Sequence, residues 1–157
     1  MAKTKKYLNI NVMDASRERI SYIFDNFERI YISFSGGKDS SVMFHLVMDE
    51  AKKRNRVVGV MLIDLEAQYT ATIEHAKTMF EEYEKYIDLH WICLPISLRN
   101  GVSNFQPKWT CWGEEEKDVW VRDMPDHWGV VSDPDFYPFF EPGMEFEEFI
   151  VLWGEWY

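Results

Sequence analysis

The sequence predicts an α/β fold with a doubly wound, mainly parallel sheet, and three observations favour it. Segments rich in strand-forming residues alternate with segments of helical periodicity between residues 14 and 94. Residues 57–63 form an almost unbroken apolar run, which is typical of a strand covered on both faces. The first candidate strand ends in a Ser-Gly-Gly turn that opens directly into a candidate helix. Short connections and right-handed crossovers then favour parallel strands.

The first helix is expected over residues 14–29, where Asp14 can cap the first turn and the apolar residues share one face. A strand of β-forming residues follows over 30–34. The next elements are expected to be a helix over 40–53, a strand over 57–63, a helix over 70–86 and a strand over 87–94. Ligands of such sheets lie beyond the carboxyl ends of the strands, which are here the turns 35–40 and 64–69 and the segment after Leu94.

The pattern changes from about Arg99, where prolines and tryptophans interrupt any regular period. We expect a short helix or strand over 114–122 and an amphipathic helix over 144–153. With 157 residues the chain favours one domain. We therefore predict a single nucleotide-binding domain over 1–157, with an α/β core at 1–98 and an irregular, aromatic-rich C-terminal cover at 99–157.

Charge and composition exclude several partners. The formal net charge is -10, so a general affinity for nucleic acid or for an anionic membrane is not expected. The sequence has no apolar run long enough for a membrane span and no apolar stretch of a signal peptide near its start. Its two cysteines, Cys93 and Cys111, do not make a disulfide framework. A cytoplasmic, reduced location is the expectation.

The turn at residues 35–40 has the chemistry of a phosphate site. Two adjacent glycines let the backbone approach a ligand closely, and the helix that follows presents free N–H groups at its positive end. Lys38 adds a positive charge, and Ser35 and Ser40 add hydroxyl groups. The loop is not a P-loop, because Ile32 and Asp39 stand where that motif needs Gly and Ser or Thr. It is not a dinucleotide fingerprint either, because that motif needs three spaced glycines.

The run Ser35-Gly36-Gly37-Lys38-Asp39-Ser40 resembles the PP-loop of ATP pyrophosphatases and of phosphoadenosine-phosphosulfate (PAPS) reductases. The acidic segment 63–69 is similar to the one that PAPS reductases carry after the second strand. Segments 94–112, 120–122 and 144–149 resemble a subgroup that includes the immunoglobulin-binding regulator proteins of enterobacteria. The resemblance implies an adenine nucleotide α-hydrolase-like fold, with adenine near the first two strand ends. The Glu-Cys-Gly segment with which PAPS reductases attack their substrate has no counterpart here.

The candidate site residues follow from the loop and from this resemblance. We expect nucleotide contacts from Ser33, Phe34, Ser35, Gly36, Gly37, Lys38, Asp39, Ser40, Asp64, Glu66, Arg99 and Arg122. Lys38 and Asp39 are the expected catalytic residues, and Asp39 and Asp64 the expected Mg²⁺ ligands, with Glu66 as a further candidate. The alternative is that Asp39 only caps its helix while Asp64 and Glu66 are solvated turn residues. Arg99 and Arg122 either clamp a phosphate or form surface ion pairs.

Three functions remain open from the sequence. The first is cleavage of Mg-ATP between the α- and β-phosphates, which adenylates an acceptor and releases pyrophosphate. The second is a sulfonucleotide enzyme acting on PAPS or adenosine phosphosulfate, for which Cys111 would be the thiol; Cys111 is otherwise a structural residue. The third is a non-catalytic nucleotide-sensing module that binds a protein partner through its aromatic C-terminal region. Each requires an adenine nucleotide, with Mg²⁺ accompanying ATP or PAPS.

Overall fold

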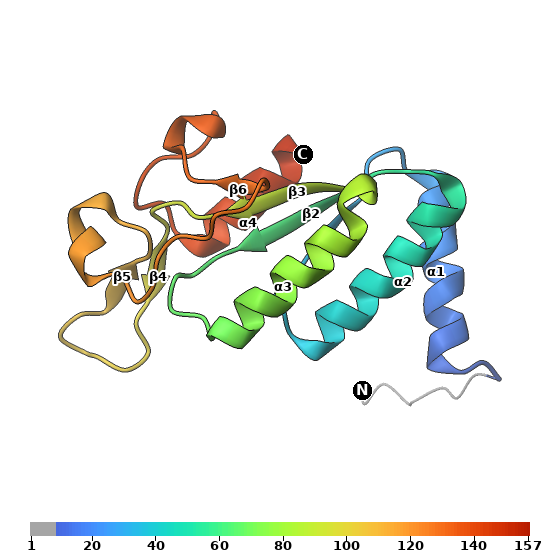
Figure 1. The fold of residues 1–157 in the computed structure, drawn as a ribbon, viewed down its shortest axis with the longest axis horizontal. Coiled ribbons are helices and arrows are strands. Elements are labelled where there is room, and N and C mark those ends of the chain that lie inside the picture. The colour runs from blue at the N-terminus through green and yellow to red at the C-terminus, as the bar shows by residue number, and fades with distance from the viewer. Residues whose placement is uncertain (1–8) are drawn as a thin grey trace, which may run out of the picture.

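The computed structural model describes residues 9–157. Residues 1–8, on which the expected absence of a signal peptide partly rests, lie outside the described part. Two sheets and four α-helices organise the rest (Figure 1). In chain order the elements are α1 (Val12–Asn26), β1 (Tyr31–Ser33), α2 (Lys38–Arg54), β2 (Val58–Ile63), α3 (Thr70–Tyr83), β3 (Ile87–Ile92), β4 (Ser97–Arg99), β5 (Lys108–Thr110), β6 (Val130–Val131) and α4 (Phe146–Trp156).

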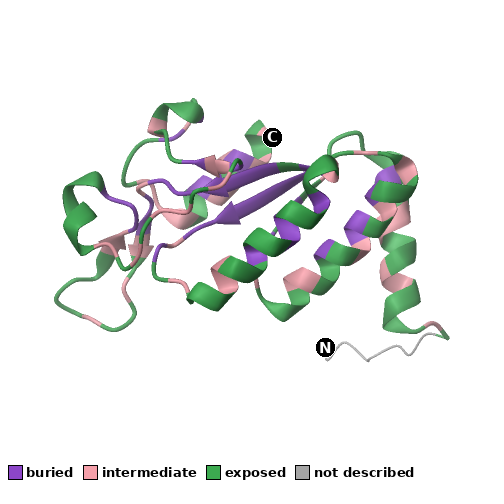
Figure 2. Ribbon diagram, viewed as in Figure 1, coloured by how far each residue is buried: buried purple, intermediate pink, exposed green. Residues whose placement is uncertain are grey.

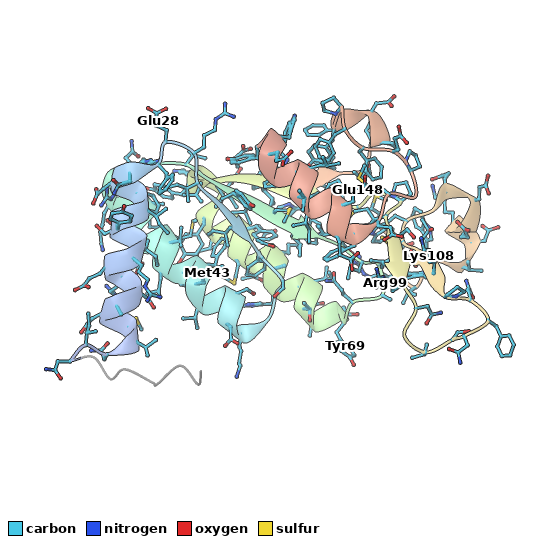
Figure 3. The ribbon with its side chains drawn as sticks, turned by 180° about the vertical axis from the view of Figure 1, so that it is seen from behind. Glu28, Met43, Tyr69, Arg99, Lys108 and Glu148 are labelled. Atoms are coloured by element: carbon cyan, nitrogen blue, oxygen red, sulfur yellow. The ribbon has the colours of Figure 1, made fainter. Side chains whose placement is uncertain are left out.

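The main sheet has the order β1-β2-β3-β6, and all three of its pairings are parallel. This confirms the predicted α/β fold with a mainly parallel sheet. Strands β1, β2 and β3 lie side by side in chain order, so the helices that connect them, α2 and α3, lie on one face of the sheet. Helix α1 packs beside α2 (Figure 1). The opposite face is covered by α4, which lies in front of the sheet in Figure 3.

Burial explains why the strands form where they do. Every residue of β2 is buried, as expected for a strand between two helical layers (Figure 2). Phe44 and Phe80 pack from α2 and α3 onto the same face, and both are fully buried. The helix expected over 70–86 ends at Tyr83 and continues as a 3-10 turn over Glu84–Tyr86. The helix expected from Ser40 begins two residues earlier, at Lys38.

The cap of the first helix differs from the prediction. Asn11, not Asp14, is the N-cap, and its side chain accepts a hydrogen bond from the Asp14 amide at 2.9 Å. The Asn11 amide group also donates to the Asp14 carboxylate. Asp14 instead contributes a negative charge to the first turn, where the helix dipole favours it.

The C-terminal half is tied into the core. Segment 99–157 supplies β6 to the main sheet and α4 to its second face. The expected boundary at 98/99 falls inside β4, which pairs with β5 as an antiparallel hairpin. Residues 114–119 form a 3-10 turn, and the helix expected over 144–153 lies at Phe146–Trp156. Several aromatic side chains of this half are buried, including Tyr137, Phe149 and Trp153.

Candidate functional site

The loop after β1 has the backbone geometry that its glycines predict. Gly36 has a φ of +73°, a left-handed conformation that costs little for glycine and more for other residues. Gly37 is extended and is the N-cap of α2, so only residues 34–37 separate the strand from the helix. Lys38 and Asp39 form the first turn of α2, and both side chains are exposed.

Serine hydroxyls hold this loop in shape. The hydroxyls of Ser40 and Ser41 both donate to the Gly37 carbonyl at 2.9 Å. The Ser35 and Ser40 hydroxyls lie 3.1 Å apart, and the Gly37 amide donates to Ser35 Oγ at 3.4 Å. The loop is therefore organised by its own side chains before any ligand arrives.

The start of α2 leaves donors free. The first amide of the helix to make a backbone hydrogen bond is that of Ser41, which donates to the Gly37 carbonyl at 3.0 Å. The main-chain amides of Lys38, Asp39 and Ser40 donate no hydrogen bond to any of residues 9–157. Free amides at a helix N-terminus, with a lysine beside them, form a ready site for an anion such as phosphate.

Helix α3 supports the loop, which sequence analysis did not foresee. A Cβ placed on Gly36 would lie 2.5 Å from Thr72 Cγ2, so glycine is required for close approach as well as for its φ. The Ser41 hydroxyl and His75 Nε2 are 2.8 Å apart. No sequence signal marks Thr72 or His75, because their contacts arise from the packing of α3 against α2.

The two predicted nucleotide contacts at the end of β1, Ser33 and Phe34, differ in exposure. Ser33 is exposed. The Phe34 side chain is buried between Phe44 and Phe80, so only its main chain is available at the strand end. The Phe34 amide is committed to the Met61 carbonyl at 2.8 Å. Phe34 therefore anchors the loop in the core, and its ring does not face a ligand.

Asp64, at the end of β2, is fully buried. One carboxylate oxygen accepts hydrogen bonds from Arg122 Nη2 and, at 2.9 Å, from the Glu66 amide. The other accepts from Trp91 Nε1 at 2.8 Å. Both oxygens therefore have protein donors, which is how a buried charge is tolerated in a protein interior.

Glu66 is also buried, and its φ is +61°. Its two carboxylate oxygens accept hydrogen bonds from the amides of Trp112 at 2.9 Å and Val121 at 2.8 Å. Trp112 Nε1 further donates to the Asp64 carbonyl at 2.7 Å. The interpretation of Asp64 and Glu66 as solvated turn residues is thus wrong. They clamp the segment 112–122 onto the end of β2.

Asp39 has different surroundings from the two buried carboxylates. Asp39 lines a hollow between α1 and α2, together with Arg19 and Met43. Asp64 is buried beneath Trp112 and Arg122. Among residues 9–157, no group of three or more His, Cys, Asp or Glu side chains is placed to hold a metal ion. The Mg²⁺ site predicted from Asp39 and Asp64 would require Asp64 to give up a protein donor, and it stays a prediction.

The two predicted arginines also lie in different surroundings. Arg122 pairs with Asp64, and its guanidinium lies 5.0 Å from the Trp112 ring centre. Arg99 is exposed on β4, directly across the hairpin from Lys108, which pairs with Glu145 at 2.5 Å. Figure 3 shows Arg99 and Lys108 at the same end of the molecule as Tyr69, which precedes α3.

A hollow of about 420 Å³ lies beside Arg99, and we name it the hairpin hollow. Its lining residues are Leu65, Ala67, Gln68, Leu98, Arg99, Trp109, Phe146 and Glu147. Gln68 Oε1 is buried without a hydrogen-bond partner among the described residues. Gln68 lies four residues before Thr72, whose methyl group limits the space at Gly36. Neither Gln68 nor Trp109 was a sequence candidate, because a single glutamine or tryptophan carries no motif.

Neither cysteine has the surroundings of a nucleophile. Burial raises the pKa of the Cys111 thiol to about 12, and the main-chain hydrogen bond at Ile96 only partly opposes this. Burial also raises the pKa of Cys93, with the Asp64 charge adding to the effect. A reactive thiol needs a lowered pKa and access to solvent, and Cys93 and Cys111 have neither.

Comparison with known proteins agrees with this geometry. Residues 29–119 match the phosphoadenosine phosphosulfate reductase domain, and the chain belongs to that family. The match includes the loop, the buried carboxylates and the hairpin. It supports nucleotide binding by a member of the PP-loop superfamily, as the loop itself indicates.

A relative in Escherichia coli (strain K12), the uncharacterized protein YbdN, is 40% identical over 152 residues. That alignment covers 96% of this chain and 36% of YbdN, so the chain spans about a third of the relative's length. No solved structure gives a match. The comparisons do not support the narrower resemblance to immunoglobulin-binding regulator proteins. Over residues 9–157, no helix combines the length and the apolar character that crossing a bilayer requires.

Proposed function

We propose that this chain binds an adenine nucleotide with its phosphates on the 35–40 loop. The observation that carries the proposal is the set of free amides at Lys38, Asp39 and Ser40, gathered at the start of α2. The fixed loop shape and the exposed Lys38 ammonium favour a multiply charged anion. In a chain with a net charge of -10, such local donors are what an anion requires.

The hairpin hollow is the proposed place of the base. Apolar walls and a few polar groups are typical of small-molecule sites, and Trp109 offers a ring for stacking. A glutamine side chain can pair with the N6 and N7 positions of adenine, and Gln68 lines this hollow. Arg99 lines the same hollow, and its proposed role is to bind the sugar or a phosphate.

The proposed reaction is adenylation with release of pyrophosphate. An acceptor oxygen attacks the α-phosphorus, the bond from that phosphorus to the oxygen bridging the β-phosphate breaks, and pyrophosphate takes the electron pair. Lys38 and the free amides stabilise the charge that gathers on the leaving group. Mg²⁺ enters as part of the Mg-ATP substrate. Asp39 is the carboxylate that belongs to the loop proposed to bind the phosphates.

The sulfonucleotide alternative has support from the family match but lacks a suitable thiol among residues 9–157. A non-catalytic nucleotide sensor requires only the loop and the hollow. Its expected protein partner would contact the aromatic side chains that the C-terminal half leaves exposed, such as Trp128 and Phe136. A cytoplasmic location remains a prediction from the sequence.

Calorimetry with ATP, AMP, PAPS and pyrophosphate, with and without Mg²⁺, tests the binding proposal. We expect ATP to bind and Lys38→Ala to weaken it at least tenfold, with Lys85→Ala as the matched control because Lys85 is exposed far along the chain. Pyrophosphate release from ATP then separates adenylation from binding alone. Absence of ATP binding in the wild-type chain, or equal binding by Lys38→Ala, would remove the proposal.

A further inference from the structure

A second hollow, larger than the hairpin hollow, lies elsewhere in the described residues. A cavity of about 850 Å³, which we name the C-terminal cavity, lies beyond the ends of β3 and β6. Its lining residues are Cys93, Pro95, Trp112, Glu114, Lys117, Asp118, Trp120, Arg122, Asp123, Met124, Ser132 and Pro134. It shares no lining residue with the hairpin hollow. The clamped turn of Asp64 and Glu66 connects to both, through Leu65 on one side and Trp112 on the other. A nucleotide held on the loop and in the hairpin hollow therefore leaves the C-terminal cavity open for a second molecule.

Arg122 gives this cavity a fixed cationic group. Its Nη2 donates to Asp64, its Nη1 donates to the Asp123 carbonyl at 3.2 Å, and its guanidinium lies over Trp112. Its Nε is buried and has no partner among residues 9–157. That atom has no surface open to the cavity, but 18% of the Arg122 side chain is exposed, so a ligand carboxylate can meet the guanidinium from the cavity side.

The remaining charges argue against a ligand that is only anionic. Three carboxylates line the cavity, those of Glu114, Asp118 and Asp123, against two cations. Both cations are engaged: Lys117 pairs with Glu114 at 3.2 Å, and Arg122 pairs with Asp64. The carboxylates of Asp118 and Asp123 take no hydrogen bond or ion pair among the described residues. These exposed acceptors favour a ligand that carries an ammonium group as well as a carboxylate.

We propose that the C-terminal cavity binds the acceptor of the reaction, and that this acceptor is a small zwitterion of the α-amino acid class. Its carboxylate meets Arg122, its ammonium group meets Asp118 or Asp123, and its side chain packs on Trp120 and Met124. The proposal rests on the proposed function for its chemistry. A carboxylate oxygen attacks the α-phosphorus, the bond to the oxygen bridging the β-phosphate breaks, and an acyl adenylate and pyrophosphate form.

Binding is tested without nucleotide, by saturation-transfer NMR on mixtures of the common L-α-amino acids followed by calorimetry on those that bind. We expect at least one amino acid to bind, and its deaminated acid and decarboxylated amine to bind at least tenfold more weakly. Asp118→Asn should weaken binding about tenfold, while Glu115→Gln, an exposed acidic neighbour outside the cavity lining, should leave it unchanged. Arg122→Gln should abolish binding. If Arg122→Gln does not fold, Asp118→Asn still tests the proposal.

The outcomes separate this proposal from the proposed function. Amino acid binding that survives Lys38→Ala, while ATP binding is lost, supports two distinct sites. If the chain binds an amino acid but never binds ATP, the assignment of the C-terminal cavity stands and the proposed adenylation chemistry is removed. No amino acid bound, equal binding by Asp118→Asn and wild type, or tighter binding of the deaminated acid than of the zwitterion would each overturn the assignment of this cavity.

Discussion

The loop at 35–40 and the turn at 64–66 follow neighbouring parallel strands, yet their polar groups are used in opposite ways. The loop side chains are mostly exposed, and three of its amides make no hydrogen bond within residues 9–157. The carboxylates of Asp64 and Glu66 are buried, and each of their oxygens accepts from a donor of the chain itself. The free groups form a binding surface, and the satisfied groups form a scaffold. An acidic residue at a strand end is therefore a ligand candidate only if its own chain leaves it free.

Removing the buried charge of Asp64 should have the largest effect. Asp64→Ala leaves Arg122 without its ion pair and Trp91 Nε1 without its acceptor, so we expect a loss of about 3–5 kcal/mol in the free energy of unfolding. Urea unfolding measures it. Asp49→Ala, at an exposed ion pair of 3.9 Å, should cost less than about 0.5 kcal/mol. A small effect of Asp64→Ala would mean that the turn is not a scaffold.

A substitution at Gly36 tests the 35–40 loop through its backbone conformation. Gly36→Ala places a Cβ 2.5 Å from Thr72 Cγ2 and imposes a φ of +73° on alanine, for which we expect a cost of about 2–3 kcal/mol. Thr72→Ser removes the contacting methyl group, so the double variant should recover about 1 kcal/mol relative to the sum of the single ones. Simple additivity in this cycle, measured by urea unfolding, would show that α3 does not press on the loop.

Much of this comparison could be predicted from the sequence, and the reason for the remainder is physical. The glycine pair, Lys38 and the following helix are local, so the phosphate loop was recognisable and its position at a strand end is confirmed. The roles of Asp64 and Glu66 depend on donors far along the chain: Arg122 lies 58 residues from Asp64, and Val121 lies 55 residues from Glu66. Of the two alternatives for Arg122, the ion pair is the one observed, but its partner is buried at the end of β2. Periodicity carries no information about such pairings.

Glu66→Gln should have an intermediate effect. The glutamine side chain is neutral and has one acceptor oxygen, so one of the Trp112 and Val121 amides loses its hydrogen bond and the other keeps only an uncharged one, at a cost of about 1–3 kcal/mol. Hydrogen exchange should quicken at Trp112 and Val121 more than at Gly59 in β2. Uniform quickening across the chain would indicate a general loss of stability and not a released clamp.

Mild acid should produce the smallest effect, through His90 beneath the C-terminal half. Burial lowers the pKa of His90, although Asp88 opposes this, and burial also lowers the pKa of His127. Because each folded-state pKa lies below its unfolded value of about 6.5, the unfolded chain binds protons first as the pH falls. Stability should therefore be full above about pH 6.5 and decline below it, by at most about 1.4 kcal/mol per pH unit for each histidine. His90→Gln should make this decline shallower, and an unchanged slope would exclude His90 as its source.

The most direct test of the phosphate loop is an NMR titration of the ¹⁵N-labelled chain with ATP, with and without Mg²⁺. The largest amide shifts should fall on Gly36, Lys38, Asp39 and Ser40, with smaller shifts at the clamped turn of Asp64 and Glu66. If the amides of the loop keep their positions at saturating ATP while other amides move, the nucleotide binds elsewhere and the loop is not its phosphate site.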